Sequence, residues 1–181
     1  SRGLGDVYKR QRSQCGGTAS RVRGLIINGW SGSAGLNTIE FITIASTGNA
    51  SDFGDLTTPV TGVRGLGSPT RGVFAGGTAP GPAATNIIGF VTIASTGNAV
   101  DFGDLTVARS SLSGTSNNTR GIIAGGYVAP AVSNVIDFIT IASAGNATDF
   151  GDLFEHVYNL GAMASETRAV FTGAYQLSPY S

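Results

Sequence analysis

The sequence predicts an all-β fold built from repeated units, and two observations carry this prediction. The same runs of residues return about every 48 positions along the 181-residue chain. These runs are rich in Ile, Val, Thr and Phe, which suit the pleated surface of a β-sheet. Because no long stretch keeps the helical period with a cap at both ends, we expect very little helix.

Three kinds of segment define the repeat. The run Phe-Ile-Thr-Ile-Ala-Ser-Thr-Gly-Asn at 41–49 returns with small changes at 90–98 and 138–146. The run Asp-Phe-Gly-Asp-Leu begins at Asp52, Asp101 and Asp149. A third segment, which is an arginine, a small residue, an apolar stretch and a small or Gly-rich ending, begins at Arg23, Arg71, Arg120 and Arg168. These arginines lie 48 or 49 residues apart, so the period varies by one residue.

Each unit is predicted to consist of strands joined by turns. The segments that begin the Phe-Ile-Thr-Ile runs are apolar along nearly their whole length, which indicates strands buried on both faces, at 38–44, 87–93 and 135–141. The Thr-Gly-Asn runs at 47–49 and 96–98 are expected to close tight hairpins, since Gly and Asn tolerate positive φ. The Gly-rich segments 72–77 and 121–126 are expected to let backbones approach closely, as near the axis of a ring.

Composition excludes several classes of protein. Charged residues are only 12% of the chain, and 11 basic residues balance 11 acidic ones, so no basic surface for nucleic acid is expected. No apolar run is long enough to span a bilayer as a helix, so we expect no membrane insertion. A single Cys, a single His and a single Trp leave few groups for nucleophilic or metal chemistry, and no cofactor or metal site is predicted.

Four short strands in each unit of about 48 residues indicate a β-propeller, in which neighbouring blades cover both faces of each sheet. Residues 1–11 do not fit the repeat and are interpreted as a leader of cloning or adaptor origin. The repeats are expected at 12–175, which is about 3.5 blades, with a tail at 176–181. Because propellers close with roughly four to eight blades, we expect a fragment of a larger ring or a ring completed by a second chain. A strained four-bladed ring is the less favoured alternative.

The repeat resembles the kelch family of propellers. Arg109 corresponds to the early arginine of a kelch unit, and the glycine doublets are Gly76-Gly77 and Gly125-Gly126. Phe53, Phe102 and Phe150 stand where kelch has Trp. The sequence departs from kelch at Asn28-Gly29 and Gly173-Ala174, and by Phe for Tyr at Phe41, Phe90 and Phe138. The Ala-Ser-Thr-Gly-Asn-Ala and Asp-Phe-Gly-Asp-Leu runs are also similar to kelch-like repeats in virion structural proteins of marine tailed phages.

The repeated charged residues have a structural interpretation and a functional alternative. We expect Arg23, Arg71, Arg120 and Arg168 to contact a neighbouring Asp or backbone carbonyl groups and so hold blades together. The alternative is that calcium is bound by the pairs Asp52/Asp55, Asp101/Asp104 and Asp149/Asp152, although the spacing lacks a dense calcium-loop pattern. Asp-Phe-Gly here lacks the other kinase motifs, so a kinase is excluded. His156 is expected to be an exposed loop residue and Cys15 a small core residue.

Candidate binding residues lie seven positions after each repeat arginine. This position holds Trp30, Thr78, Tyr127 and Tyr175, just beyond the Gly-rich strand end. We expect Trp30, Tyr127 and Tyr175 to stack on sugar rings or anchor a protein, with capping of blade edges as the structural alternative.

The sequence therefore predicts a non-catalytic structural and binding module. The resemblance to phage proteins implies a virion or tail-fibre-associated protein, outside the cell, that attaches to a protein or to a cell-surface glycan of the host. The competing hypothesis is an intracellular kelch-type protein scaffold. An enzyme acting on carbohydrate is less favoured, since no non-repeating cluster of acid–base residues stands out. Homo-oligomers or further blades in a longer parent chain are compatible with all of these.

Overall fold

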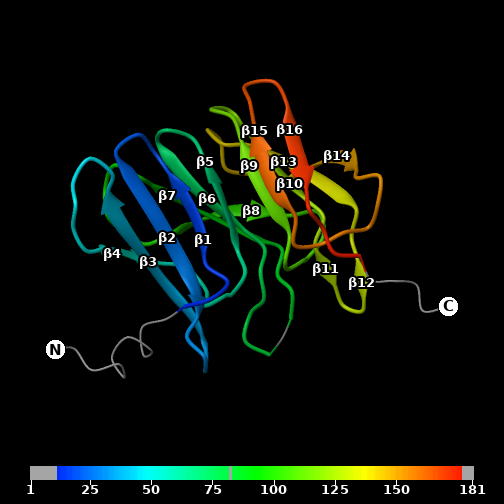
Figure 1. The fold of residues 1–181 in the computed structure, drawn as a ribbon, viewed down its shortest axis with the longest axis horizontal. Coiled ribbons are helices and arrows are strands. Elements are labelled where there is room, and N and C mark those ends of the chain that lie inside the picture. The colour runs from blue at the N-terminus through cyan, green and yellow to red at the C-terminus, as the bar shows by residue number, and fades with distance from the viewer. Residues whose placement is uncertain (1–11, 82, 177–181) are drawn as a thin grey trace.

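The computed structural model describes residues 12–81 and 83–176, and they form β-strands without any helix (Figure 1). The prediction of an all-β fold is therefore confirmed for this part of the chain. No helix long and apolar enough to cross a membrane occurs in it. The expected leader at 1–11 and residues 177–181 of the expected tail lie outside the described residues.

Three antiparallel sheets of four strands follow one another along the chain, and we number them as units. Unit 1 contains β1 (Gly16–Ala19), β2 (Arg23–Trp30), β3 (Gly35–Thr43) and β4 (Ser51–Asp55). Unit 2 contains β5 (Arg64–Gly67), β6 (Arg71–Ala75), β7 (Ile87–Thr92) and β8 (Val100–Asp104). Unit 3 contains β9 (Ser113–Ser116), β10 (Arg120–Ala124), β13 (Val135–Thr140) and β14 (Thr148–Asp152).

A half unit follows unit 3. It consists of β15 (Gly161–Ala164) and β16 (Ala169–Thr172), which occupy the first two positions of a fourth sheet. A small hairpin, β11 (Tyr127–Val128) and β12 (Ala131–Val132), is inserted between the second and third strands of unit 3.

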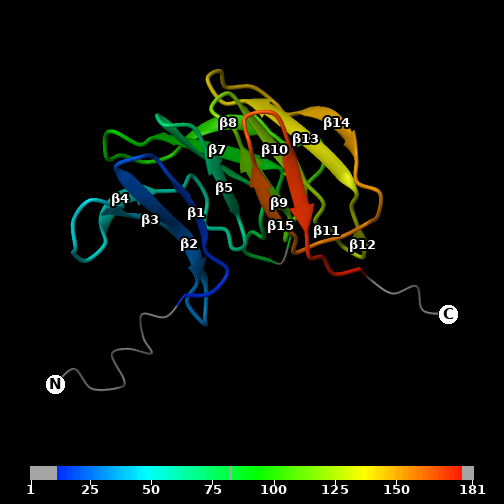
Figure 2. The ribbon, with the colours of Figure 1, turned by 45° about the horizontal axis from the view of Figure 1, so that its top comes forward.

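The first strands of the units lie side by side in the order β1, β5, β9 and β15. The units therefore form a curved row whose inner side is made of these first strands. The row is open in both views (Figures 1 and 2).

The apolar core lies between successive sheets. Side chains of unit 1 such as Ile27, Ile39 and Phe53 pack in one cluster with side chains of unit 2, including Val91 and Ile93. The same positions of units 2 and 3 form a second cluster. Fully burying one aliphatic or aromatic side chain of this size contributes about 1.5–3 kcal/mol. The continuously apolar strands exist because each inner sheet packs against a neighbour on both sides.

Unit 1 differs from this prediction of two-sided burial. Ile42 and Ile44 are 39% and 52% exposed, whereas the equivalent Val91 and Ile93 of unit 2 are 3% and 1% exposed. The reason is positional, because the described residues hold no sheet before unit 1 for this face to pack against.

The expected tight hairpin at Thr-Gly-Asn is wrong. The chain turns earlier, where Ser95 N donates to Thr92 O at 3.3 Å, and residues 93–99 form a longer connection between β7 and β8. Gly97 and Asn98 instead contact the outer strand of the preceding unit. The glycine here serves an approach between sheets rather than a turn within one.

The glycine doublet lies at the outgoing end of the second strand, against the residues that lead into the first strands. Gly76 and Gly77 have φ of 62° and 108°, which side-chain-bearing residues rarely adopt. A Cβ at Gly76 would lie 2.6 Å from Arg109 O, and one at Gly77 would lie 2.7 Å from Thr61 O. The doublet therefore leaves space for the connections that lead into units 2 and 3. The expected close approach of backbones is therefore found at these glycines.

Candidate functional site

The candidate binding residues lie on one face of the row, where the incoming connection of each unit meets the residues that follow its second strand. The position seven residues after each repeat arginine pairs its backbone with a residue in the incoming connection of the same unit, as in Ser13↔Trp30, Thr61↔Thr78, Ser110↔Tyr127 and Tyr158↔Tyr175. In unit 3, Tyr127 N donates to Ser110 O at 2.7 Å and Ser110 N donates back at 3.1 Å. These pairs hold each loop residue against the sheet, at the end opposite to the first turn of each unit.

Three tyrosines form a row at this end, which we call the tyrosine ladder: Tyr127, Tyr158 and Tyr175. The ring centroids of Tyr127 and Tyr158 are 6.2 Å apart, and those of Tyr158 and Tyr175 are 5.8 Å apart. Tyr175 is 65% exposed, while the other two are half-buried. The ladder thus offers a stepped aromatic surface with one open end.

Trp30 lies apart from the ladder. It is 41% exposed and lines a separate hollow of about 510 Å³, together with Thr78 and the loop that contains Pro80. The structure therefore brings Tyr127 and Tyr175 into one ladder through Tyr158 and places Trp30 in a separate hollow on the same face of the row.

Tyr158 joins Tyr127 to Tyr175, and the sequence analysis missed it. The signal that could have found it is the repeat itself. Tyr158 stands ten residues before Arg168, a position that Ser13, Thr61 and Ser110 occupy in the other units. Tyr158 and Tyr175 can be predicted to touch only when it is known that these two positions of the unit pair with each other.

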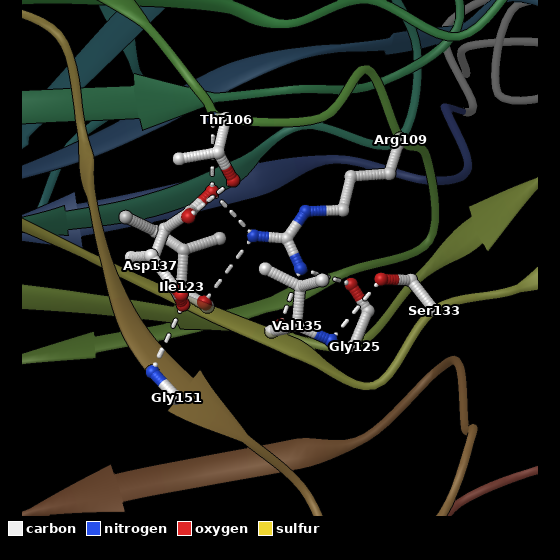
Figure 3. A network of polar contacts seen from close by, with 9 residues as sticks. Thr106, Arg109, Ile123, Gly125, Ser133, Val135, Asp137 and Gly151 are labelled. Carbon is white, nitrogen blue, oxygen red and sulfur yellow. Dashed lines mark hydrogen bonds and ion pairs between the residues drawn. The ribbon is translucent and has the colours of Figure 1, made fainter.

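A buried ion pair supports the connection that carries Ser110. Arg109 and Asp137 are both 0% exposed, and Arg109 Nη2 donates to Asp137 Oδ2 at 2.6 Å (Figure 3). Arg109 Nη1 also donates to the carbonyl oxygens of Gly125 and Val135 at 3.0 and 2.5 Å. Asp137 in turn accepts from Thr106 Oγ1 at 2.6 Å and Thr106 N at 3.2 Å.

This network ties three segments of the chain together. It joins the connection between units 2 and 3 to β13 and to the glycine doublet after β10. Burial disfavours the charge and lowers the pKa of Arg109, while the Asp137 carboxylate opposes this change. Arg109 Nε has no hydrogen-bond partner. The pair fixes the chain immediately before Ser110, so it positions the base of the tyrosine ladder.

The residues equivalent to this pair change together between units. Unit 1 has Arg12 and Glu40, whose side chains form a 3.1 Å ion pair that is partly exposed. Unit 2 has Val60 and Gly89 at the same positions, both buried. An arginine thus occurs only where the third strand supplies a carboxylate, within the three complete units that the structure describes.

The repeat arginines contact backbone carbonyl groups of the next unit. Arg23 Nη1 donates to Ile93 O and Ala94 O at 2.8 and 2.9 Å, and Arg71 Nη1 donates to Ile141 O at 2.9 Å. Each also lies over a phenylalanine of its own sheet, with Arg23 over Phe41 at 4.8 Å and Arg71 over Phe90 at 4.7 Å.

Arg120 lies in the same way over Phe138, at 4.5 Å, and Arg168 is exposed. Those phenylalanines pack edge-to-face on the predicted set Phe53, Phe102 and Phe150.

The repeated aspartates contribute mainly backbone groups, although the Asp149 carboxylate accepts from Gly151 N at 3.0 Å. Asp55 N donates to Asn98 Oδ1 at 3.0 Å, and Asp104 N donates to Asn146 Oδ1 at 3.1 Å. Asp152 is exposed. Between residues 12 and 176, position 82 apart, no ion pair joins these aspartates to the repeat arginines, and no group of three or more His, Cys, Asp or Glu side chains gathers as a metal site would require.

His156 and Cys15 have minor roles in this geometry. His156 is exposed, and its Nδ1 lies 2.8 Å from Val132 O. Cys15 is half-buried, whereas the equivalent Val63 and Leu112 are 2% and 0% exposed. Leu112 packs against Gly76 of the preceding unit. Cys15 has no preceding sheet within the described residues, so its expected core position is only partly reached.

A polar hollow lies on the opposite face of the row. It has a volume of about 540 Å³ and is lined by the turns between the first and second strands, which carry Arg21, Ser68, Asn118 and Glu166. Asn117 Nδ2 donates to Glu166 O at 2.8 Å across two of these turns. This hollow could not be predicted from the sequence, because the four turns meet only when the units stand side by side.

No protein-family model matches the sequence, and no curated protein matches it significantly.

Proposed function

We propose that the chain is a kelch-like β-propeller module that binds other molecules and does not itself catalyse a reaction. Its support is the row of four-stranded antiparallel sheets with their first strands side by side, which is the arrangement of blades around a propeller axis. The Arg, Gly-Gly and Phe positions of the repeat favour the kelch family among propellers. Fold alone does not define a function, so the binding proposal rests on the loop face.

The tyrosine ladder carries the binding proposal. Tyrosine rings offer a flat apolar face and a hydroxyl group at little cost in side-chain entropy, and they dominate many recognition surfaces. Three rings in a row, with Tyr175 65% exposed at the open end, fit the ring faces of a saccharide chain better than a single small molecule. We therefore favour a cell-surface glycan as ligand.

The proposed setting is a phage virion, as a tail-fibre-associated module that attaches to the host surface from outside the cell. This setting rests on the resemblance of the repeat to phage virion proteins, and a glycan ligand agrees with it. The alternative is an intracellular kelch-type scaffold in which the same tyrosines anchor a protein.

The test is a glycan array probed with the fluorescently labelled chain, followed by titration of any hit against variants. Tyr158→Ala removes the central ring and is expected to weaken binding by roughly 30-fold, the effect of a hot-spot aromatic. Tyr175→Phe keeps the stacking face and is expected to change affinity by less than about threefold.

Thr78→Ala is the matched control, because Thr78 holds the equivalent position in unit 2. Loss of binding in Trp30→Ala, with Tyr158→Ala unaffected, would move the site to the hollow beside unit 1. An array without any hit would argue against a saccharide ligand and favour the protein scaffold.

A further inference from the structure

Successive units are joined by a recurring backbone clasp. Gly97 N donates to Phe53 O at 2.7 Å, and Ala99 N donates to Asp55 O at 2.8 Å, so the connection after β7 runs along the free edge of β4. Asn98 completes the clasp by accepting from Asp55 N at 3.0 Å. Unit 3 holds unit 2 in the same way, through Gly145, Asn146 and Ala147 on the backbone of Phe102 and Asp104.

The clasp requires a glycine on the strand that receives it. A Cβ at Gly54 would lie 2.4 Å from Gly97 O, and a Cβ at Gly103 would lie 2.5 Å from Gly145 O. The Asp-Phe-Gly-Asp run is thus the receiving half of the clasp, and Gly-Asn-Ala is the donating half.

Apolar side chains of the donating strands fill the space beside the clasp. Val91 and Ile93 are 3% and 1% exposed against unit 1, and Ile139 and Ile141 are 2% and 1% exposed against unit 2. The arginine of the receiving unit donates to the carbonyl group of the second of these isoleucines, as Arg71 does to Ile141. Each junction therefore combines backbone bonds, a buried apolar pair and one arginine.

Unit 3 repeats the receiving half, and no donating run reaches it within the described residues. A Cβ at Gly151 would meet nothing within 4 Å, although its φ of 135° matches the 143° of Gly103. Phe150 is 55% exposed, whereas Phe102 is 3% exposed. The guanidinium of Arg120 lies over Phe138 without a carbonyl acceptor in the described part of the next unit. Arg120 and Phe150 line a hollow of about 630 Å³ together with Phe171 of β16.

The half unit restricts which strands can supply the donating run, because its first and second strands are already present. β15 and β16 occupy the first and second positions of a sheet, and β16 has no strand on its other side within the described residues. A complete unit docked here would collide with β15 and β16. A strand pair that brings only the third and fourth positions fits.

We propose that the edge formed by β16, the hollow and β14 is a docking site for the third and fourth strands of a further repeat unit. The occupant is a β-strand pair that carries the repeat's own Phe-Ile/Val-Thr-Ile-Ala-Ser and Gly-Asn-Ala runs. Its third strand pairs with β16, its two apolar residues enter the hollow, and its Gly-Asn-Ala run clasps β14. Arg120 then donates to a carbonyl group of the occupant as Arg71 does to Ile141.

The test is complementation by a synthetic peptide with the sequence of residues 86–105, the third and fourth strands of unit 2. The labelled peptide is titrated against the full chain by fluorescence anisotropy, and we expect saturable 1:1 binding. Hydrogen exchange is measured on the same complex. We expect new protection at residues 148–152 and 169–172 and unchanged exchange in β7 and β8.

Peptide variants separate docking from non-specific adhesion and leave the protein intact. Ile93→Asp places a carboxylate in the hollow and is expected to weaken binding by at least about 100-fold. Asn98→Ala removes the side-chain acceptor of the clasp and is expected to weaken binding by about fivefold. Thr96→Ala changes an exposed side chain and serves as the control, with less than a twofold effect expected.

Three results would overturn the proposal. They are no binding at millimolar peptide, equal binding of the native and Ile93→Asp peptides, and protection that appears away from β14 and β16.

Discussion

At the residue scale, Arg109 shows how a charge is kept inside this fold. Its guanidinium has no exposed surface, and its hydrogen bonds go to Asp137 and to carbonyl groups of the backbone around it. Taking such a pair out of water costs several kcal/mol per ion, so each partner is tolerable only because the other is present. The Val60 and Gly89 of unit 2 show the alternative solution in the same chain.

We predict that the uncharged residues of unit 2 can replace the ion pair of unit 3. Arg109→Val alone leaves Asp137 buried without its cation and is expected to lower the free energy of unfolding by about 3–5 kcal/mol. The double variant Arg109→Val with Asp137→Gly copies unit 2 and should recover more than half of that loss. Urea unfolding of both single variants and the double variant gives the coupling energy.

The control is the partly exposed pair of unit 1. Removing Arg12 from its 3.1 Å contact with Glu40 should cost no more than about 1 kcal/mol, as surface ion pairs usually do. Simple additivity in the Arg109–Asp137 cycle would contradict the interpretation.

We also predict that two chemically identical substitutions differ in effect. Arg71→Lys loses the hydrogen bond to Ile141 O as well as its position over Phe90, whereas Arg120→Lys loses only the position over Phe138. The first should destabilise the chain by about 1 kcal/mol more than the second, measured as the difference in urea midpoint at constant slope. Equal midpoints would show that the bond between units contributes nothing.

At the element scale, the connection between the third and fourth strands holds successive sheets together. It covers the free edge of the neighbouring outer strand, and so satisfies backbone groups that would otherwise be an open template for aggregation. Within the described residues no such connection covers the edge of β14, and a Cβ at Gly151 would meet nothing within 4 Å.

This difference predicts unequal effects at equivalent glycines. Gly103 and Gly151 have similar φ, 143° and 135°, so alanine is strained equally at both. Only at Gly103 does the new Cβ meet the backbone of Gly145, at 2.5 Å. Gly103→Ala should therefore lower the free energy of unfolding by about 1–3 kcal/mol more than Gly151→Ala, the usual cost of overpacking. Similar losses in denaturant unfolding would argue against the clasp.

At the scale of the whole molecule, the main contacts between units join neighbours in the row, as between β1 and β5, β5 and β9, and β9 and β15. Stability in such an array is a sum of the stabilities of units and junctions, so it falls toward an incomplete end. Unit 2 has junctions on both sides, whereas β15 and β16 contribute half a sheet with exposed Met163 and Val170, at 61% and 51%.

Native-state hydrogen exchange should show this gradient. We expect amides of β15 and β16 to exchange at least about 100-fold faster than those of β6 and β7, because the half unit opens locally while unit 2 opens only with the array. Mass spectrometry of peptic fragments resolves the two regions. Uniform exchange along the row would show that the array unfolds as one cooperative body.

Much of this architecture follows from periodicity. The repeat predicted strands that are found with little change, and β7 and β13 begin at the predicted Ile87 and Val135. The Phe53 and Phe102 positions recur because each is buried at a junction between sheets. The Thr-Gly-Asn run was misassigned because Gly and Asn have the same local signature in a turn and in a close approach between sheets. Only the neighbour of each sheet distinguishes the two.

The all-β class, the unit length and the buried strands could be predicted from the sequence, because these depend on residue type and spacing along the chain. The residues that meet across units could be identified only in the folded chain. Tyr158 joins the ladder, Arg109 finds Asp137, and the clasp reaches back to the preceding sheet. Such contacts join segments tens of residues apart, and they exist only once the sheets stand side by side. The secondary-structure propensity of individual residues does not predict that arrangement.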